Sequence, residues 1–375
     1  MSKYPKSETF DGCFIFFGDV RFDSRLQNIL RSLSKKYSRL LLLQISEQDE
    51  TFEFERCQVR SFAISSKVRG TVKFLKFYRL LLPEVFKVRA KFFCAEDVFS
   101  LPLAYQAARR RKARLYYDSR ELFFALAQLA KKRIKQRFWA GVEAHCIRRA
   151  KVFTSGTRDA DALVARYRIK RPEVIFNYPR YHAYRRSRTL HQRLQLPDDT
   201  VILLYQGIIT EGRGIWKLLN MLTWLENHFV AVFIGDGDKL TDLRQAIAAQ
   251  NYQQRAFAIG RVPHAELLRL TASADIGFAL IEPLSESYNL ALPNKLFEYV
   301  MAGVPVVASD LPAMKDVIEA YRVGTVVSAH EEEKRIAECV LGLYENLEKY
   351  RSYCRKAREV FNWEAQEEQL LRFFS

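Results

Sequence analysis

Short apolar runs alternate with longer amphipathic segments along most of the chain. In the first half the apolar runs lie at residues 10–17, 40–45, 91–95, 114–117, 151–154 and 173–176, and helical spacing is found at 25–36 and 121–150. In the second half apolar runs at 201–206, 229–234, 256–260, 276–281 and 304–308 alternate with helical patterns at 214–226, 241–250, 264–273 and 295–302. Strands alternating with helices are typical of βαβ units around a parallel sheet. The pattern predicts an α/β protein with two successive doubly wound halves.

The rhythm breaks at Asn177-Tyr178-Pro179, and residues 181–200 are basic, polar and weakly periodic. We therefore expect an N-terminal domain at 1–180, a linker at 181–200 and a second domain from residue 201. Ligands of open α/β sheets bind beyond the carboxyl ends of the strands. Asp97 and Asp118, which follow two predicted strands, are functional candidates on this ground.

A glycine-bearing stretch leads from the strand at 201–206 into a helix. It contains Gly207, Gly212 and Gly214, with Arg213 at the helix entrance. An arginine beside free N–H groups at a helix N-terminus can bind phosphate. Turns between strands and helices use glycine for purely structural reasons about as often, so both interpretations stay open here.

A second stretch places two opposite charges on one helix. Pro293 and Asn294 suit a helix start, with Asn294 as the expected N-cap, and Lys295 and Glu298 then lie at i and i+3 on one face. This arrangement offers a cation to a phosphate and a carboxylate to a ribose hydroxyl. The alternative is a surface salt bridge between Lys295 and Glu298.

The run that follows, EYVMAGVPVVASDLP from Glu298 to Pro312, resembles the family-4 glycosyltransferases. The segments Gly235-Asp236-Gly237, Gly260-Arg261-Val262-Pro263 and Ala274-Asp275-Ile276-Gly277 add to the resemblance, which covers about residues 201–327. It is looser in the first half. Three positions depart from the family pattern: Ile208, Leu290 and Arg120 stand where many relatives have arginine, glutamate and histidine.

The resemblance implies the GT-B architecture, in which two Rossmann-like domains face each other across a cleft. The donor domain would span 201–348, and a helix at 349–375 would cross back to the first domain. Glu298 would bind the ribose, and Lys295 and Arg213 would neutralise the diphosphate. The remaining implied donor-site positions are Gly207, Gly212, Gly214, Gly235, Gly237, Asn289, Leu290 and Asn294, and the acceptor-side positions are Asp97, Asp118, Arg120 and Glu121.

The implied activity is transfer of a sugar, with retention, from a UDP- or GDP-sugar to a glycan or lipid-linked acceptor. The leaving diphosphate can itself take the acceptor proton, and Arg213, Lys295 and helix N-termini stabilise its charge. We expect no permanently bound cofactor and no metal, because no clustered Asp-x-Asp presents itself as a metal ligand in the donor half. None of the six histidines forms a spaced pair, and the six cysteines are scattered.

The net charge of +17 is concentrated in the first half, where Lys67–Arg149 holds 21 basic and 6 acidic residues. Basic and aromatic residues alternate there, as in segments that lie in a membrane interface. We expect peripheral attachment to an anionic cytoplasmic leaflet; the alternative is a solvated basic face. The chain has no apolar run of membrane-spanning length, and residues 1–11 lack a signal-peptide core.

Two other functions remain open. A non-catalytic polyanion- or nucleic-acid-binding protein on a GT-B-like scaffold would account for the basic segment, although no nucleic-acid module is recognisable and we expect no nucleic acid partner. A nucleotide-sugar 2-epimerase shares the architecture. It would require acid and base groups along the cleft, and the sequence offers no such set.

Overall fold

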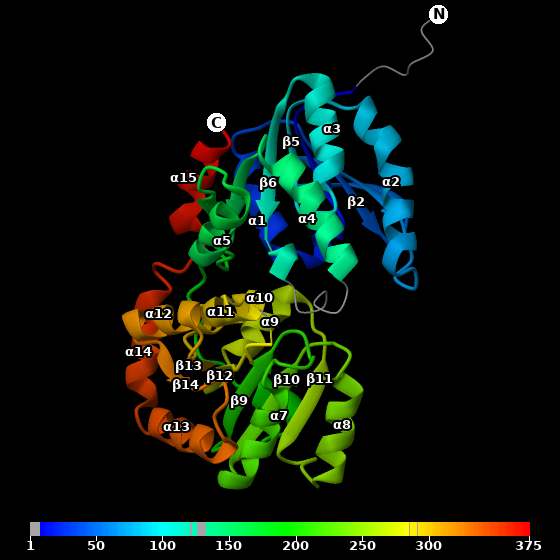
Figure 1. The fold of residues 1–375 in the computed structure, drawn as a ribbon. Coiled ribbons are helices and arrows are strands. Elements are labelled where there is room, and N and C mark those ends of the chain that lie inside the picture. Colours follow the sequence, from blue (N-terminus) through cyan, green and yellow to red (C-terminus); the bar gives the residue numbers. More distant parts are fainter. Residues whose placement is uncertain (1–7, 121, 126–132, 285, 291) are drawn as a thin grey trace, which may run out of the picture. The chain divides into compact units, whose positions relative to one another are not determined.

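The computed structural model describes residues 8–120, 122–125, 133–284, 286–290 and 292–375. The chain folds into two compact units (Figure 1). Unit 1 comprises Met1–Asn177 and Gln366–Ser375, and unit 2 comprises Tyr178–Ala365. Each unit is a parallel sheet with helices on it, so the predicted α/β class with two Rossmann-like units is confirmed.

Unit 1 is built on an eight-stranded sheet of order β3-β4-β2-β1-β5-β6-β7-β8. Only the edge pair β3–β4 is antiparallel. The central strands are buried on both faces, as expected for a parallel sheet covered by helices. The strands are β1 (Thr9–Phe16), β2 (Leu40–Ser46), β3 (Glu50–Phe54), β4 (Cys57–Ala63), β5 (Arg89–Ala95), β6 (Arg114–Ser119), β7 (Lys151–Thr154) and β8 (Glu173–Val174).

The helices of unit 1 follow the strands in βαβ order. The short 3-10 helices η1 (Val20–Phe22) and η2 (Phe123–Ala125) accompany them. Asp23 caps the first long helix by accepting a 2.7 Å hydrogen bond from the Leu26 main-chain N. The helices are α1 (Ser24–Ser34), α2 (Gly70–Lys87), α3 (Leu101–Arg111), α4 (Arg133–Ile147), α5 (Thr157–Tyr167) and α15 (Glu364–Phe373).

The C-terminal segment completes the core of unit 1. Phe374, which follows α15, is 0% exposed. Its ring stacks on Tyr116 with the centroids 4.2 Å apart, and it also contacts Phe92 and Phe153 at 5.5 and 5.7 Å. Residues that are distant in sequence therefore form one aromatic layer against the sheet.

Unit 2 has a six-stranded, all-parallel sheet of order β11-β10-β9-β12-β13-β14. The first strand, β9, lies between β10 and β12. The strands β10 and β11 therefore extend the sheet on one side of β9, and β12, β13 and β14 extend it on the other. The strands are β9 (Val201–Gln206), β10 (Phe229–Ile234), β11 (Ala256–Gly260), β12 (Ile276–Ala279), β13 (Val306–Ser309) and β14 (Gly324–Val327).

The helices of unit 2 cover both faces of this sheet. One 3-10 helix, η4 (Met221–Trp224), continues from the end of α7. The helices are α6 (Thr189–Leu194), α7 (Ile215–Asn220), α8 (Leu240–Ala249), α9 (His264–Thr271), α10 (Glu286–Asn289), α11 (Asn294–Ala302), α12 (Pro312–Tyr321), α13 (Glu333–Glu345) and α14 (Leu347–Ala357).

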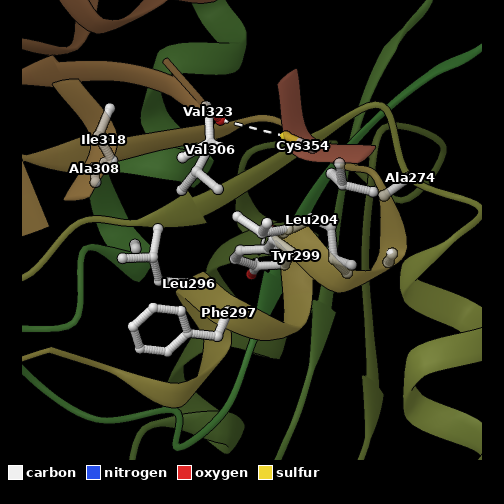
Figure 2. Packing of buried hydrophobic residues seen from close by; sticks show 14 of the residues in the cluster. Leu204, Ala274, Leu296, Phe297, Tyr299, Val306, Ala308, Ile318, Val323 and Cys354 are labelled. Carbon is white, nitrogen blue, oxygen red and sulfur yellow. Dashed lines mark hydrogen bonds between the residues drawn. The ribbon is translucent and has the colours of Figure 1, made fainter. Parts of the chain in front are cut away.

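Helix α11 is held against the sheet by a buried apolar core (Figure 2). Leu296, Phe297 and Tyr299 of α11 are all buried in it. The Tyr299 hydroxyl lies 3.0 Å from both the Leu204 carbonyl oxygen, to which it donates, and the Gln206 main-chain N, which donates to it. These contacts fix α11 on the strand β9, and with it Lys295 and Glu298, which also contact residues of β9.

The unit boundaries differ from the expected domains in two places. The stretch 181–200, expected to be a linker, belongs to unit 2 and contains α6. Helix α14 also belongs to unit 2, because Arg351 donates a 2.7 Å hydrogen bond to the buried carboxylate of Asp275. Only Gln366–Ser375 of the expected crossing helix at 349–375 belongs to unit 1.

Several elements differ from the predicted ones. The hairpin β3–β4 and the edge strand β14 were not predicted. Within the predicted helix at 121–150, α4 is observed at Arg133–Ile147 and η2 at Phe123–Ala125, while residues 121 and 126–132 lie outside the described residues. Among the described residues, no helix is both long and apolar enough to cross a bilayer.

Candidate functional site

The polar side chains of unit 2 gather at the carboxyl ends of β9 and its neighbours. In a sheet of this order, the first strand is flanked by strands whose connections run in opposite directions, and ligands bind in the crevice outside that point. In this sheet that point lies beyond Gln206, the last residue of β9. The turn between β9 and α7 and the start of α11 border it.

Lys295 lies at this crevice, although its position on α11 makes it largely buried. Its exposed fraction is 8%, and Nζ lies 3.6 Å from the centroid of the Tyr205 ring on β9. A Cβ placed on Gly207 would lie 3.5 Å from Nζ. The ammonium group therefore sits between an aromatic face and bare main chain, where a cation is attracted by the ring.

No hydrogen bond or ion pair joins Lys295 Nζ to any of the residues that the structure describes. Burial lowers the pKa of Lys295 well below its ordinary value, the nearby Arg213 charge lowers it further, and Glu298 opposes the shift. A buried ammonium without an anionic partner is unfavourable. An anion bound at this place would supply the missing partner.

Arg213 is the second cation at the site. Its guanidinium carbon lies 4.5 Å from the centroid of the Tyr288 ring. Its Nε is buried and has no hydrogen-bond acceptor among the described residues. Lys295 Nζ and Arg213 Nε thus both have no acceptor among the described residues, and the Arg213 charge lowers the pKa of Lys295. Two neighbouring cations of this kind form a site whose chemistry fits a diphosphate.

The predicted glycines bring main chain close to these cations. Gly207, Gly212 and Gly214 lie in the turn between β9 and α7, and Gly235 and Gly237 lie in the turn after β10. The two turns are in contact, because a Cβ on Gly235 would lie only 1.8 Å from the Gly207 carbonyl oxygen. Only glycine fits at Gly235, and the close packing leaves the crevice lined by backbone.

Glu298 lies on the same helix, one turn after Lys295. Its Oε2 accepts a 2.5 Å hydrogen bond from Nε2 of Gln206, which is 1% exposed. The sequence interpretation did not single out Gln206. The only available signal was a polar residue at the end of an otherwise apolar buried strand.

The remaining predicted donor-site residues surround the start of α11. Asn289 ends α10 and is exposed, and Leu290 follows it half-buried. Asn294 is exposed and is the first residue of α11; the N-cap is Pro293 and not Asn294 as expected, because the Pro293 backbone is extended and Asn294 is already helical.

Of the predicted acceptor-side residues of unit 1, Asp118 and Arg120 form an ion pair, whereas Asp97 accepts hydrogen bonds from the main chain. The Asp97 carboxylate accepts from the main-chain N of Phe17 at 2.8 Å and of Ser100 at 2.7 Å. Asp118 is fully buried and accepts from Arg25 Nε at 2.7 Å and Nη2 at 2.9 Å. Glu121 lies outside the described residues.

Arg120 connects three carboxylates into a network. It pairs with Asp23 and Glu96, and its Nε donates to Asp118 at 3.0 Å. Burial raises the pKa of Glu96 to about 7, and the Arg120 charge opposes that shift. The structure thus places Arg120 among buried partners, which fix its position at the carboxyl edge of the unit 1 sheet.

No group of three or more His, Cys, Asp or Glu side chains suited to holding a metal ion occurs within the described ranges.

Comparisons with known proteins concern both the sequence and the fold. Residues 186–360 match the family described as Glycosyl transferases group 1. TuaC of Bacillus subtilis (strain 168), assigned as a glycosyltransferase of teichuronic acid biosynthesis, is 28% identical over 122 residues. That match covers 32% of this chain and 28% of TuaC, so the chain matches little more than a quarter of that relative's length.

Two solved structures resemble nearly the whole chain. Anabaena HepE in complex with UDP and glucose has a TM-score of 0.75 and 15% identity, covering 97% of this chain and 98% of HepE. Sucrose-phosphate synthase from Thermosynechococcus elongatus has a TM-score of 0.78 and 15% identity, with coverages of 97% and 98%. The chain therefore has the GT-B fold.

Proposed function

We propose that the protein is a glycosyltransferase that takes its sugar from a nucleoside diphosphate sugar bound in unit 2. The observation that carries the proposal is the pair of cations Lys295 and Arg213 next to the glycine-bearing turn after β9, whose Nζ and Nε have no hydrogen-bond acceptor among the described residues. The match to the group 1 glycosyltransferases at 186–360 includes both residues. Glu298, on the same helix as Lys295, would accept a hydrogen bond from a ribose hydroxyl.

The proposed reaction is a hexosyl transfer with retention. The bond between the anomeric carbon and the diphosphate oxygen breaks, the bond to the acceptor oxygen forms on the same face, and the leaving diphosphate takes the acceptor's proton. Lys295 and Arg213 stabilise the charge that develops on the diphosphate. Because both are side-chain cations, the proposed transfer does not depend on a bound metal.

We expect a nucleoside diphosphate to raise the melting temperature of the protein in the presence of EDTA. UDP is the first probe, because HepE was solved with UDP and glucose, and GDP is the second. At 100 times Kd, a ligand adds about 2.7 kcal/mol to the free energy of unfolding of the unit that binds it. Differential scanning calorimetry against UDP, GDP, ADP, CMP and TDP measures the effect.

The control for this experiment is UMP, which has the base and ribose of UDP and lacks the second phosphate. It should stabilise much less than UDP does. If heparin stabilises the protein and none of the diphosphates does, the donor site is refuted. The protein would then be a polyanion-binding protein.

We also propose that the acceptor is a lipid-linked or cell-surface glycan precursor and that unit 1 binds the anionic membrane surface holding it. The relative TuaC is assigned to teichuronic acid biosynthesis. The surface concerned, here called the α2–α4 patch, has exposed apolar side chains flanked by exposed lysines and arginines. It comprises Val72, Leu75, Ile134 and Phe138 together with Lys67, Arg69, Lys76, Lys135 and Arg137.

The two helices of the patch are neighbours, because Phe74 of α2 contacts Trp139 of α4 with ring centroids 5.4 Å apart. Phe77, Leu81 and Val85 of α2 are buried in the core. This is also what the alternative of a solvated basic face predicts, since such a helix packs its apolar side on the sheet. Ile134 and Phe138 nevertheless remain 87% and 63% exposed. Apolar side chains surrounded by basic ones are suited to an anionic bilayer interface.

The protein is expected to sediment with vesicles containing 30% phosphatidylglycerol at low salt and to remain in solution with vesicles of pure phosphatidylcholine. Replacing Leu75 and Phe138 together with serine should weaken vesicle binding about 10-fold or more, because two apolar side chains no longer enter the interface. Trp224→Ser, which removes an exposed apolar side chain of unit 2, is the control. Equal sedimentation of all three proteins would contradict the assignment of the patch.

A further inference from the structure

A chain of buried polar contacts lies behind the carboxylate of Glu298. Gln206 Nε2 donates to Glu298 Oε2 at 2.5 Å, and the Thr271 hydroxyl on α9 lies 2.7 Å from Gln206 Oε1. Gln206 and Thr271 are 1% and 0% exposed. The chain therefore connects α9, β9 and α11 inside unit 2.

The contacts at its two ends decide how the Gln206 amide is oriented. A carboxylate only accepts hydrogen bonds, so the amide nitrogen must face Glu298. The amide oxygen then faces the Thr271 hydroxyl, whose single proton has two acceptors within reach, Gln206 Oε1 at 2.7 Å and the Leu267 carbonyl oxygen at 2.8 Å. Reversing the amide would place its oxygen against the carboxylate, which is repulsive in a buried setting. Gln206 is also fixed through its main-chain N, which donates to the Tyr299 hydroxyl at 3.0 Å.

We propose that Gln206, oriented by Thr271, is a positioning residue that holds the Glu298 carboxylate in place to recognise the ribose hydroxyls of the donor nucleotide. The inference rests on the proposed function, in which Glu298 binds ribose. Neither Gln206 nor Thr271 needs to touch the nucleotide. A carboxylate with one oxygen fixed by a buried amide has lost its torsional freedom before the ligand arrives, which strengthens its bond to a hydroxyl.

The role is tested by how well the protein distinguishes a nucleotide that has ribose hydroxyls from one that lacks them. Isothermal titration gives Kd for UDP and for 2′,3′-dideoxy-UDP, or for the GDP pair if GDP is the stronger ligand. The wild-type protein should prefer UDP by about 10-fold or more, because a hydrogen bond to a charged group is lost in the dideoxy compound. Gln206→Leu should bring this preference down to about 3-fold or less, the value expected for Glu298→Gln.

Thr271 supplies a matched pair of variants if Gln206→Leu does not fold. Thr271→Val keeps the shape and loses the hydroxyl, so it should reduce the preference for UDP, whereas Thr271→Ser keeps the hydroxyl and the preference. Binding of dideoxy-UDP should change little in all of them, which a general loss of structure would not produce.

Two results would overturn the inference in distinguishable ways. A folded Gln206→Leu or Thr271→Val protein that keeps the wild-type preference would show that the buried chain does not position Glu298, and the donor site would stand. A wild-type protein that binds neither UDP nor GDP would remove the proposed donor site itself, and the positioning role with it.

Discussion

Lys295→Met is expected to give a protein that is more stable than the wild type and has lost its nucleotide binding. Methionine can follow the path of the lysine stem without bringing a charge into the core. Because Lys295 Nζ has no described hydrogen-bond or ion-pair partner and burial lowers its pKa, removing the charge should raise the free energy of unfolding by about 1–2 kcal/mol. The lost contact to the diphosphate should raise Kd about 30-fold or more.

Urea denaturation and titration with UDP or GDP measure the two effects separately. Lys315→Met is the matched control, since Lys315 is exposed on α12 and lies 3.8 Å from Glu319. That variant should change stability by less than about 0.5 kcal/mol and leave Kd unaltered. A Lys295→Met protein that is less stable, or that binds nucleotide normally, would show that the ammonium serves the fold and not an anion.

Phe374→Ala should destabilise unit 1 while unit 2 keeps its stability. The Phe374 ring is fully buried and stacks on Tyr116 at 4.2 Å, so its removal leaves a cavity bordered by aromatic rings. Such truncations typically cost about 3–5 kcal/mol. Calorimetry with and without nucleotide assigns the transitions, because only the transition of unit 2 should move with the ligand.

Arg372→Ala provides the comparison in the same C-terminal segment. Arg372 is exposed and pairs with Glu368 at 3.7 Å, an interaction of a kind that contributes about 0–1 kcal/mol. If Arg372→Ala and Phe374→Ala lower the stability of unit 1 equally, the C-terminal segment does not complete its core.

The strands of unit 2 could be predicted closely because they are continuous apolar runs bounded by glycine and charge. β9, β10 and β11 have the predicted bounds of 201–206, 229–234 and 256–260. The hairpin β3–β4 could not be predicted in this way. In its edge strand β3, exposed residues alternate with half-buried ones. Its turn has Glu55 at a φ of +55°, a position where glycine or asparagine would have indicated a turn in the sequence.

The candidate site was predictable as far as local spacing and resemblance go. The sequence singles out Lys295 and Glu298, but their i, i+3 spacing is equally compatible with a surface salt bridge. The burial of Lys295 argues against a surface salt bridge. That burial depends on β9, about 90 residues earlier in the chain. For the same reason the Gln206–Glu298 contact and the Arg120 network, in which Asp23 is 97 residues away, carry no local sequence signal.

Unit 1 is made of two segments that are far apart in the sequence, and this affects the order in which its parts are synthesised. A ribosome makes chains from the N-terminus, so all eight strands of the first sheet are made before unit 2, and Gln366–Ser375 is made after it. Until then the rings of Phe92, Tyr116 and Phe153 lack their neighbour Phe374. The half of the protein that emerges first is therefore completed last, and its nascent form exposes aromatic surface of the kind that chaperones bind.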